Sequence, residues 1–197
     1  AMFKIEKPDV KRPTLSEAHM IYSERCVENS TCFPKEKNKG KVGQFLEGVL
    51  GIPTSSACLD CVDGELKAFP LVELKKSSRI GEPFGLGEGD KVAKETVAIT
   101  MVTPSSLSHT SFKESRLRKK ISNVLFAPYY RYGDDITWHE GRVFDCEHPL
   151  WDEIREDYET IQKFYAENGY TKSKIGKWLQ VRTKGAGRGA PKTYAFY

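Results

Sequence analysis

The nine residues Leu59-Asp-Cys-Val-Asp-Gly-Glu-Leu-Lys67 constrain this chain more than any other stretch. In a β-strand successive side chains point to opposite faces, so Glu65 and Lys67 share one face and the leucine between them points into a core. Gly64 allows a turn or a close backbone approach, which would bring Asp60 back beside Glu65. Two converging carboxylates make an oxygen site suited to Mg²⁺, and an adjacent ammonium can orient a water or stabilise charge on a phosphate. The stretch therefore predicts a strand with a metal site for attack on a phosphate.

An aspartate followed after a short gap by Glu-x-Lys is the signature of metal-dependent nucleases of the PD-(D/E)xK kind. The same three letters are common on exposed strands, where they form a solvated face that contributes little energy. A second copy, Glu73-Leu-Lys75, follows in this chain, and Asp63 would be its upstream acid. The motif alone leaves the choice between the two copies open, as well as the choice between a site and a surface.

The composition is that of a globular domain. Of the 197 residues, 39% are hydrophobic and 29% are charged, which predicts one domain over residues 1–197 or two closely packed lobes. No apolar run reaches the length of a membrane span and no signal peptide opens the chain, so we expect a cytoplasmic protein without a membrane partner. The five cysteines are an odd number, which favours reduced thiols.

The pair Cys58-x-x-Cys61 brackets Asp60 and has three interpretations. A zinc half-site would need a partner pair, and Cys26 and Cys32 have an unusual spacing for one. A redox pair would need a thioredoxin-like βαβ context. Two small, buried or half-buried thiols are the third interpretation.

The net charge of +4 is modest, but the cations are unevenly placed. No acidic residue follows Glu167, whereas seven cations do: Lys172, Lys174, Lys177, Arg182, Lys184, Arg188 and Lys192. A basic C-terminal segment on a nearly balanced protein is typical of a face that binds a polyanion. The alternative is a solvated basic tail, which the aromatic residues among these charges disfavour.

Two helices are predicted before the motif. Thr14-x-x-Glu17 is a capping box, and apolar residues at helical spacing continue to about Asn29. A second amphipathic helix is expected from Lys41 to Gly51. Glu47 lies beside its apolar stripe, so it is either a surface acid or a third carboxylate of the site.

The rest of the chain predicts strands, one long helix and further strands. We expect a strand over residues 65–69, a break or sheet edge at Pro70 and a loop over residues 81–89. The β-prone run 96–103 predicts a strand buried on both faces, and 120–127 a second core strand. Residues 136–144 predict a strand or hairpin, and 151–168 an amphipathic helix with Pro149 at its first position and Gly169 at its end. Two strands around a basic loop would close the chain, over 176–183 and 193–197.

Five pieces of the sequence, in order, resemble the MutH family of GATC endonucleases, which includes a mismatch-repair nicking enzyme and a type II restriction enzyme. They are Gly40-Lys-Val-Gly-Gln-Phe-Leu-Glu47, Gly64-Glu-Leu-Lys-Ala-Phe-Pro-Leu71, Lys120-Ile-Ser-Asn-Val-Leu-Phe126, Asp157-Tyr-Glu-x-Ile161, and Leu179-Gln-Val-Arg-Thr-Lys-Gly185 with the closing Ala195-Phe-Tyr197. The family's catalytic strand reaches a proline soon after its lysine, which matches the first Glu-x-Lys copy and not the second.

The resemblance implies roles for individual residues. Asp60 and Glu65 would bind the metal, Lys67 would serve the attacking water, Glu47 would add a carboxylate, and Lys120 would contact the reacting phosphate. In the same way, the DNA-reading positions would be Arg182, Lys184 and Tyr197, and Arg188 belongs to the basic loop beside them.

These observations together predict a mixed α+β protein with the PD-(D/E)xK restriction-endonuclease-like fold. We expect a central mixed sheet flanked by helices, with DNA in a cleft. Residues 1–40 would form an N-terminal helical arm and residues 170–197 a DNA-recognition segment. The expected activity is Mg²⁺-dependent cutting of double-stranded DNA by an enzyme of the restriction type. The resemblance implies that the cut sequence is GATC. The alternatives are a nickase that needs a mismatch-repair activator protein, and a catalytically silent DNA-binding module.

Overall fold

The computed structural model describes residues 11–35, 40–54, 57–73, 91–94, 96–184 and 193–197. Its main element is a six-stranded sheet in which the strands of the central path lie in the order β1-β6-β5-β2-β3. β7 pairs with the start of β5, on the same edge of β5 that β6 occupies further along the strand. The strand bounds are β1 Ser30–Cys32, β2 Glu65–Glu73, β3 Lys91–Ala93, β5 Asn123–Tyr132, β6 Asp135–Trp138 and β7 Arg142–Asp145. β2 and β5 are parallel and the other pairs are antiparallel, so the central sheet is mixed as predicted.

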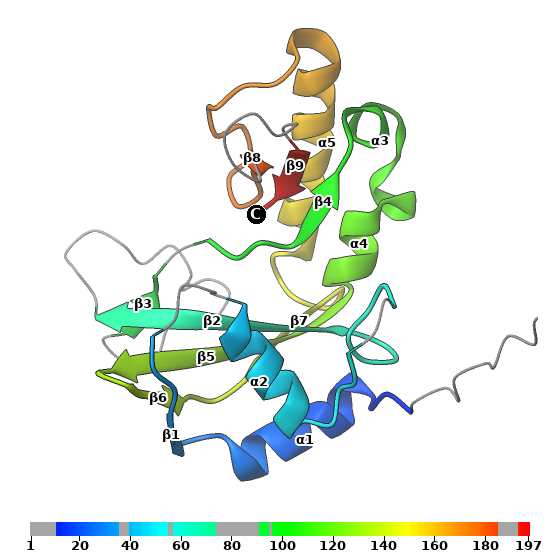
Figure 1. The fold of residues 1–197 in the computed structure, drawn as a ribbon. Helices are drawn as coiled ribbons and strands as arrows, with labels where there is room; N and C mark the ends of the chain where they lie inside the picture. Colours follow the sequence, from blue (N-terminus) through cyan, green and yellow to red (C-terminus); the bar gives the residue numbers. More distant parts are fainter. Residues whose placement is uncertain (1–10, 36–39, 55–56, 74–90, 95, 185–192) are drawn as a thin grey trace, which may run out of the picture.

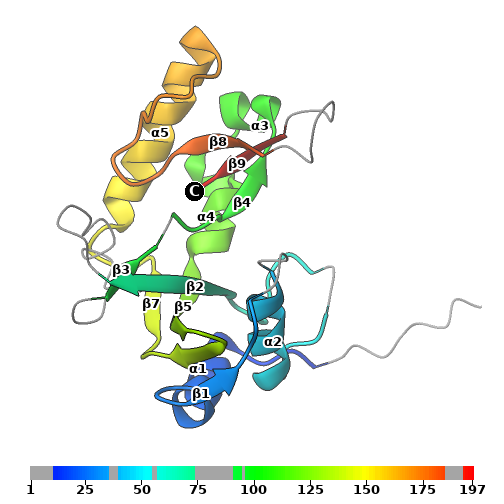
Figure 2. The same ribbon diagram turned by 60° about the vertical axis from the view of Figure 1, so that its left-hand side comes forward.

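The molecule has two halves (Figures 1 and 2). The sheet half holds the six-stranded sheet with α1 (Leu15–Arg25) and α2 (Lys41–Val49). The helical half holds α3 (Pro104–His109), α4 (Arg116–Ile121), α5 (Trp151–Asn168), a single 3₁₀ turn (Phe112–Glu114) and a three-stranded sheet. In the small sheet β9 (Thr193–Phe196) lies between β4 (Thr100–Val102) and β8 (Val181–Lys184). The mixed α+β architecture with helices on both sides of the sheet agrees with the prediction.

Alternating residues of β5 join the two halves. Leu125 and Ala127 belong to the core that α1 and α2 cover, whereas Val124 and Phe126 face the core of the helical half. Because successive strand residues point to opposite faces, one strand contributes to both cores and holds the halves together.

The N-terminal residues are part of the sheet half. Thr14 caps α1, its side chain accepting the N–H of Glu17 at 3.1 Å, as the capping box predicts. The helix buries Leu15, Ala18 and Tyr22 in the core under the sheet. β1 then pairs with β6 along the edge of the sheet. Residues 11–32 are therefore packed into the sheet half.

Three expectations about elements are corrected. Lys120 lies in the last turn of α4, and the strand begins only at Asn123, because Ser115 caps a short helix by accepting the N–H of Arg118. The run 96–103 contributes only β4, an edge strand of the small sheet whose Met101 is 44% exposed, so it is not a core strand. Pro149 precedes the N-cap of α5 and is not its first residue.

Other boundaries agree with the expectations. α5 spans Trp151–Asn168 and ends at Gly169 with φ 73°, a conformation that glycine adopts readily. β2 continues through Pro70, whose carbonyl accepts the N–H of Lys94 beyond the end of β3. The proline, which has no N–H to donate, therefore lies at an edge of the sheet. The expected loop 81–89 lies outside the described residues. In the described part of the chain, no helix is both long and apolar enough to cross a membrane.

Candidate active site

β2 presents its charged residues to the side of the sheet that faces the helical half. Its first residue, Glu65, is only 2% exposed, and Leu66 points the other way into the core under α1 and α2. A Cβ on Gly64 would lie 2.6 Å from the carbonyl oxygen of Asn123, a distance that no side chain tolerates. The glycine therefore lets the preceding loop pass close against β5, as the sequence predicted.

The loop before β2 returns Asp60 to the start of the strand. One carboxylate oxygen of Asp60, Oδ2, accepts the backbone N–H of Leu66 at 3.0 Å. The side chain also makes a hydrogen-bond contact with the carboxyl group of Glu65. The turn thus brings together the two acids that the spacing predicted to meet.

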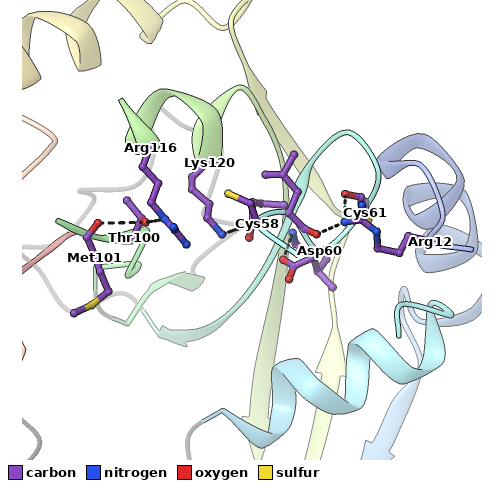
Figure 3. Close-up of polar contacts among 11 residues, drawn as sticks. Arg12, Cys58, Asp60, Cys61, Thr100, Met101, Arg116 and Lys120 are labelled. Carbon is purple, nitrogen blue, oxygen red and sulfur yellow. Dashed lines mark hydrogen bonds and ion pairs between the residues drawn. The ribbon is translucent and has the colours of Figure 1, made fainter. Parts of the chain in front are cut away.

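Lys120 reaches the same place from α4, above the sheet. Its Nζ donates to the carbonyl oxygen of Cys58, in the loop that carries Asp60 (Figure 3). It also donates to Oε1 of Glu65 at 2.9 Å. The side chains of the ion pair are 13% and 3% exposed for the lysine and the glutamate. The lysine therefore ties the helical half to the acidic loop.

The environment of Glu65 favours its neutral form. Burial, followed by the hydrogen-bond contact with Asp60, raises the pKa of Glu65 to about 7, although the neighbouring Lys120 acts in the opposite direction. A buried acid in contact with a second acid resists ionisation, because the two negative charges would repel each other in a poorly solvated place. A cation placed between the two carboxylates would relieve that repulsion.

Glu47 faces this group from α2. Burial raises the pKa of the Glu47 carboxyl, the charge of Asp60 raises it further, and Lys67 lowers it. Asp60 and Lys67 are therefore both within electrostatic reach of Glu47. The structure thus brings together all five predicted catalytic residues, from α2, the loop before β2, β2 itself and α4.

The carboxylates suit a hard cation that needs few protein ligands. Among the residues described, no three or more of His, Cys, Asp and Glu form a group able to hold a metal ion. Mg²⁺ is typically held by one or two carboxylates together with water and substrate phosphates. Asp60 and Glu65, with their mutual repulsion, fit that requirement.

The second Glu-x-Lys copy is not arranged in this way. Asp63 accepts the backbone N–H of Leu15 through Oδ1 at 2.7 Å, so it stabilises the start of α1. Glu73 is exposed and lies 3.4 Å from the hydroxyl of Tyr130. Lys75 lies outside the described residues.

All five cysteines are free thiols. Cys61 is fully buried, and burial together with the charge of Asp60 raises the pKa of its thiol to about 12. A thiol that remains protonated is a poor nucleophile and a poor metal ligand. Cys58 and Cys61 therefore fit the third interpretation, that of small residues that pack around the loop.

Two of the four predicted DNA-binding residues are in contact. The guanidinium carbon of Arg182 lies 5.0 Å from the ring centroid of Tyr197, a cation–π arrangement. The backbone of Tyr197 exchanges two hydrogen bonds with Gln180, at 2.9 and 3.0 Å. Lys184 ends β8 opposite Thr193, whereas Arg188 lies outside the described residues. In both views the C-terminus lies on the side of the helical half that faces the large sheet (Figures 1 and 2).

Sequence reasoning gave no role at the site to Arg116, an exposed cation on α4. Figure 3 shows its side chain and that of Lys120, one helical turn later, leaving the helix on the same side. Its Nε donates to the hydroxyl of Thr100 at 3.1 Å. It also lines a cavity of about 650 Å³ in the helical half, whose walls do not include the carboxylates. The i, i+4 spacing would have paired the two cations if residues 116–121 had been interpreted as a helix.

No curated protein matches this chain in sequence. The family model described as DNA mismatch repair enzyme MutH matches residues 54–163, more than half of the chain. The matched region contains Asp60, Glu65, Lys67 and Lys120, together with the β2–β5 pair that carries the site. Members of this family are DNA endonucleases with the PD-(D/E)xK fold. The chain belongs to the MutH family.

Proposed function

We propose that the protein is a Mg²⁺-dependent, sequence-specific endonuclease that cuts double-stranded DNA at GATC, in the manner of a type II restriction enzyme. The observation that carries the proposal is the buried carboxyl group of Glu65, in contact with both Asp60 and Lys120. A structural role alone does not explain why two acids and a lysine from separate elements meet at the end of a strand.

Each residue has a part in phosphodiester hydrolysis. Asp60 and Glu65 would hold Mg²⁺, which when bound supplies charge neutralisation and an acidified water. Lys67 orients the attacking water from the same strand face, and Glu47 contributes a further negative charge beside it. Lys120 has three N–H donors and uses two of them on Cys58 and Glu65, which leaves one for a phosphate oxygen.

The basic segment after Glu167 supplies the DNA contacts. We assign phosphate contacts to cations that precede β8, and base readout to Arg182, Lys184 and Tyr197. Arg188 would contribute to the same basic surface. Arg116, on the same side of α4 as Lys120, would contact a phosphate beside the one that reacts.

A nicking enzyme of mismatch repair is the second candidate, because the matching family model carries that description. Such an enzyme would cut one strand of hemimethylated GATC and would need an activator protein. A silent DNA-binding module is disfavoured, since binding alone gives no reason to keep Asp60, Glu65, Lys67 and Lys120 together.

The test is incubation of the purified protein with Mg²⁺ and plasmids whose GATC sites are unmethylated, hemimethylated or fully methylated. Linear product without any partner protein would support the restriction enzyme. Open circles confined to hemimethylated plasmid would support the nickase. Intact plasmid under all conditions, with DNA binding retained, would contradict the restriction enzyme. The same result in the presence of a mismatch-repair activator protein would also contradict the nickase and leave the silent module.

A further inference from the structure

The loop that carries Asp60 has no regular secondary structure. Residues 57–63 are a series of bends, closed by one internal hydrogen bond from the N–H of Cys61 to the carbonyl of Gly64 at 2.9 Å. Lys120 holds the near side of the loop through the carbonyl of Cys58. Such a segment keeps one conformation only if other parts of the molecule hold its peptide groups.

Arg12 holds the other side. Its Nη1 donates to the carbonyl oxygens of Leu59, at 2.6 Å, and Cys61, at 3.4 Å (Figure 3). These are the residues immediately before and after Asp60. One guanidinium therefore fixes the peptide groups on both sides of the acid, with charge-assisted hydrogen bonds that are stronger than neutral ones.

The residues after Arg12 add two further attachments. The N–H of Val62 donates to the carbonyl of Pro13 at 3.0 Å, and Asp63 accepts the N–H of Leu15 at 2.7 Å. The segment 12–15 thus follows the loop along its whole second half. Since α1 is packed into the core of the sheet half, its start is a rigid support for the loop.

We infer that Arg12 is a positioning residue of the active site, which holds Asp60 in place to bind a divalent cation beside Glu65. The inference rests on the proposed metal site and deepens it. Arg12 does not touch the reacting atoms; it acts through the backbone on either side of Asp60. Without it, the peptide groups on either side of Asp60 would lose their shared support, and part of the cation-binding energy would be spent on ordering the loop.

Metal binding by the full chain without DNA tests this inference. The probe is Mn²⁺, titrated while the electron paramagnetic resonance signal of the free ion is followed. The variants are Arg12→Ala, Arg12→Lys and Glu65→Ala, with Lys11→Ala as the matched control, because Lys11 is the adjacent cation and is exposed. Thermal unfolding of each variant is measured in parallel, without metal.

Arg12→Ala should bind Mn²⁺ at least fivefold more weakly than wild type, Arg12→Lys should recover most of the affinity, and Lys11→Ala should match wild type. Unchanged Mn²⁺ affinity in Arg12→Ala, with only a lower melting temperature, would overturn the inference and leave Arg12 a purely structural residue. If Arg12→Ala does not fold, the milder Arg12→Gln takes its place, and an Mn²⁺ affinity of Arg12→Gln equal to that of wild type would overturn the inference equally. Wild type that binds Mn²⁺ no better than Glu65→Ala would instead overturn the metal site itself.

Discussion

The ammonium of Lys120 lies 2.9 Å from a carboxylate oxygen of Glu65, and both side chains are largely withdrawn from water. The two residues come from different halves of the molecule, α4 above the sheet and the first position of β2. An ion pair in such a place contributes little net stability, because desolvation offsets the attraction, but removing one partner leaves the other charge buried. Both members of this ion pair are predicted catalytic residues, which points to a functional role for the pair.

Lys120→Met should remove cutting and should also raise the pKa of Glu65 further, since the lysine is one of the influences that lower it. Because Glu65 can then take up a proton, the loss of stability at pH 6 should stay below the 3–5 kcal/mol typical of a broken buried pair, and should grow toward pH 8. Cleavage assays and urea unfolding at the two pH values check this. Equal stability of the variant and wild type at pH 8 would contradict the buried pair.

The raised pKa of Glu65 predicts how stability varies with pH in the metal-free protein. The folded state holds the proton up to about pH 7, whereas the unfolded chain releases it near pH 4.5. The stabilising contribution is therefore complete below about pH 4.5 and is lost as the pH rises through 7. Glu65→Gln, which cannot ionise, should lack this loss.

Between pH 5 and pH 8, wild type should lose more stability than Glu65→Gln, by on the order of 2–3 kcal/mol. Urea unfolding in the presence of a chelator measures the difference. Addition of Mg²⁺ at pH 8 should restore stability to wild type and not to the variant. Parallel pH profiles for the two proteins would show that Glu65 is not the buried acid described here.

Asp157 should control the geometry of β8, the strand that carries Arg182 and Lys184. It is 8% exposed and accepts three consecutive backbone N–H groups, from Lys177, Trp178 and Leu179, at 2.7 to 3.0 Å. These residues lead directly into β8. Asp157→Asn removes acceptors while keeping the shape, and should cost about 1–3 kcal/mol in stability.

The same substitution should weaken discrimination between GATC and sites changed at one base, because Arg182 follows the loosened segment. Competition binding in Ca²⁺ gives the discrimination, and Glu156→Gln, at the adjacent exposed acid, is the control. Unchanged discrimination, together with lower stability, would limit Asp157 to holding the fold.

Lys184 and Lys172 should differ in what they contribute to DNA binding. Lys184→Ala should weaken binding and relax discrimination, by about 1–3 kcal/mol if a bidentate base contact is lost. Lys172→Ala should weaken binding similarly on all sequences and reduce the salt dependence, as the loss of a phosphate contact does. Affinities for GATC and a one-base variant at two salt concentrations separate the two. Equal losses on both duplexes for Lys184→Ala would move base readout to Arg182 or Tyr197.

Local signals in the sequence predicted the elements that local forces determine. The capping residue Thr14, the amphipathic run of α5 and the glycine at its end placed two helices, and alternation around Leu66 placed β2, the strand of the candidate site. The spacing of Asp60 and Glu65 predicted that they meet, because a short loop with Gly64 allows few other paths.

Contacts between distant segments were beyond prediction. Lys120 precedes the β-prone run Val-Leu-Phe. Nothing in that run shows that Lys120 belongs to a short helix, which Ser115 caps and which ends at Ile121. Arg12 and Leu59 are 47 positions apart, and no periodic pattern connects them. The run around Met101 is β-prone but finds a single strand partner in the small sheet, so its position in the fold, and not its composition, left it exposed.

The most direct test of the metal site at Asp60 and Glu65 compares cleavage of one unmethylated GATC plasmid, in Mg²⁺, by wild type, Asp60→Ala, Glu65→Ala and Glu73→Ala. The first two variants lose predicted metal ligands, whereas Glu73 is an exposed acid on the same strand and is the control. We predict that wild type and Glu73→Ala cut, that Asp60→Ala and Glu65→Ala do not, and that all four bind the duplex in Ca²⁺ with similar affinity. Cutting by Glu65→Ala, with loss of cutting in Glu73→Ala, would contradict the assignment of Glu65 as a metal ligand.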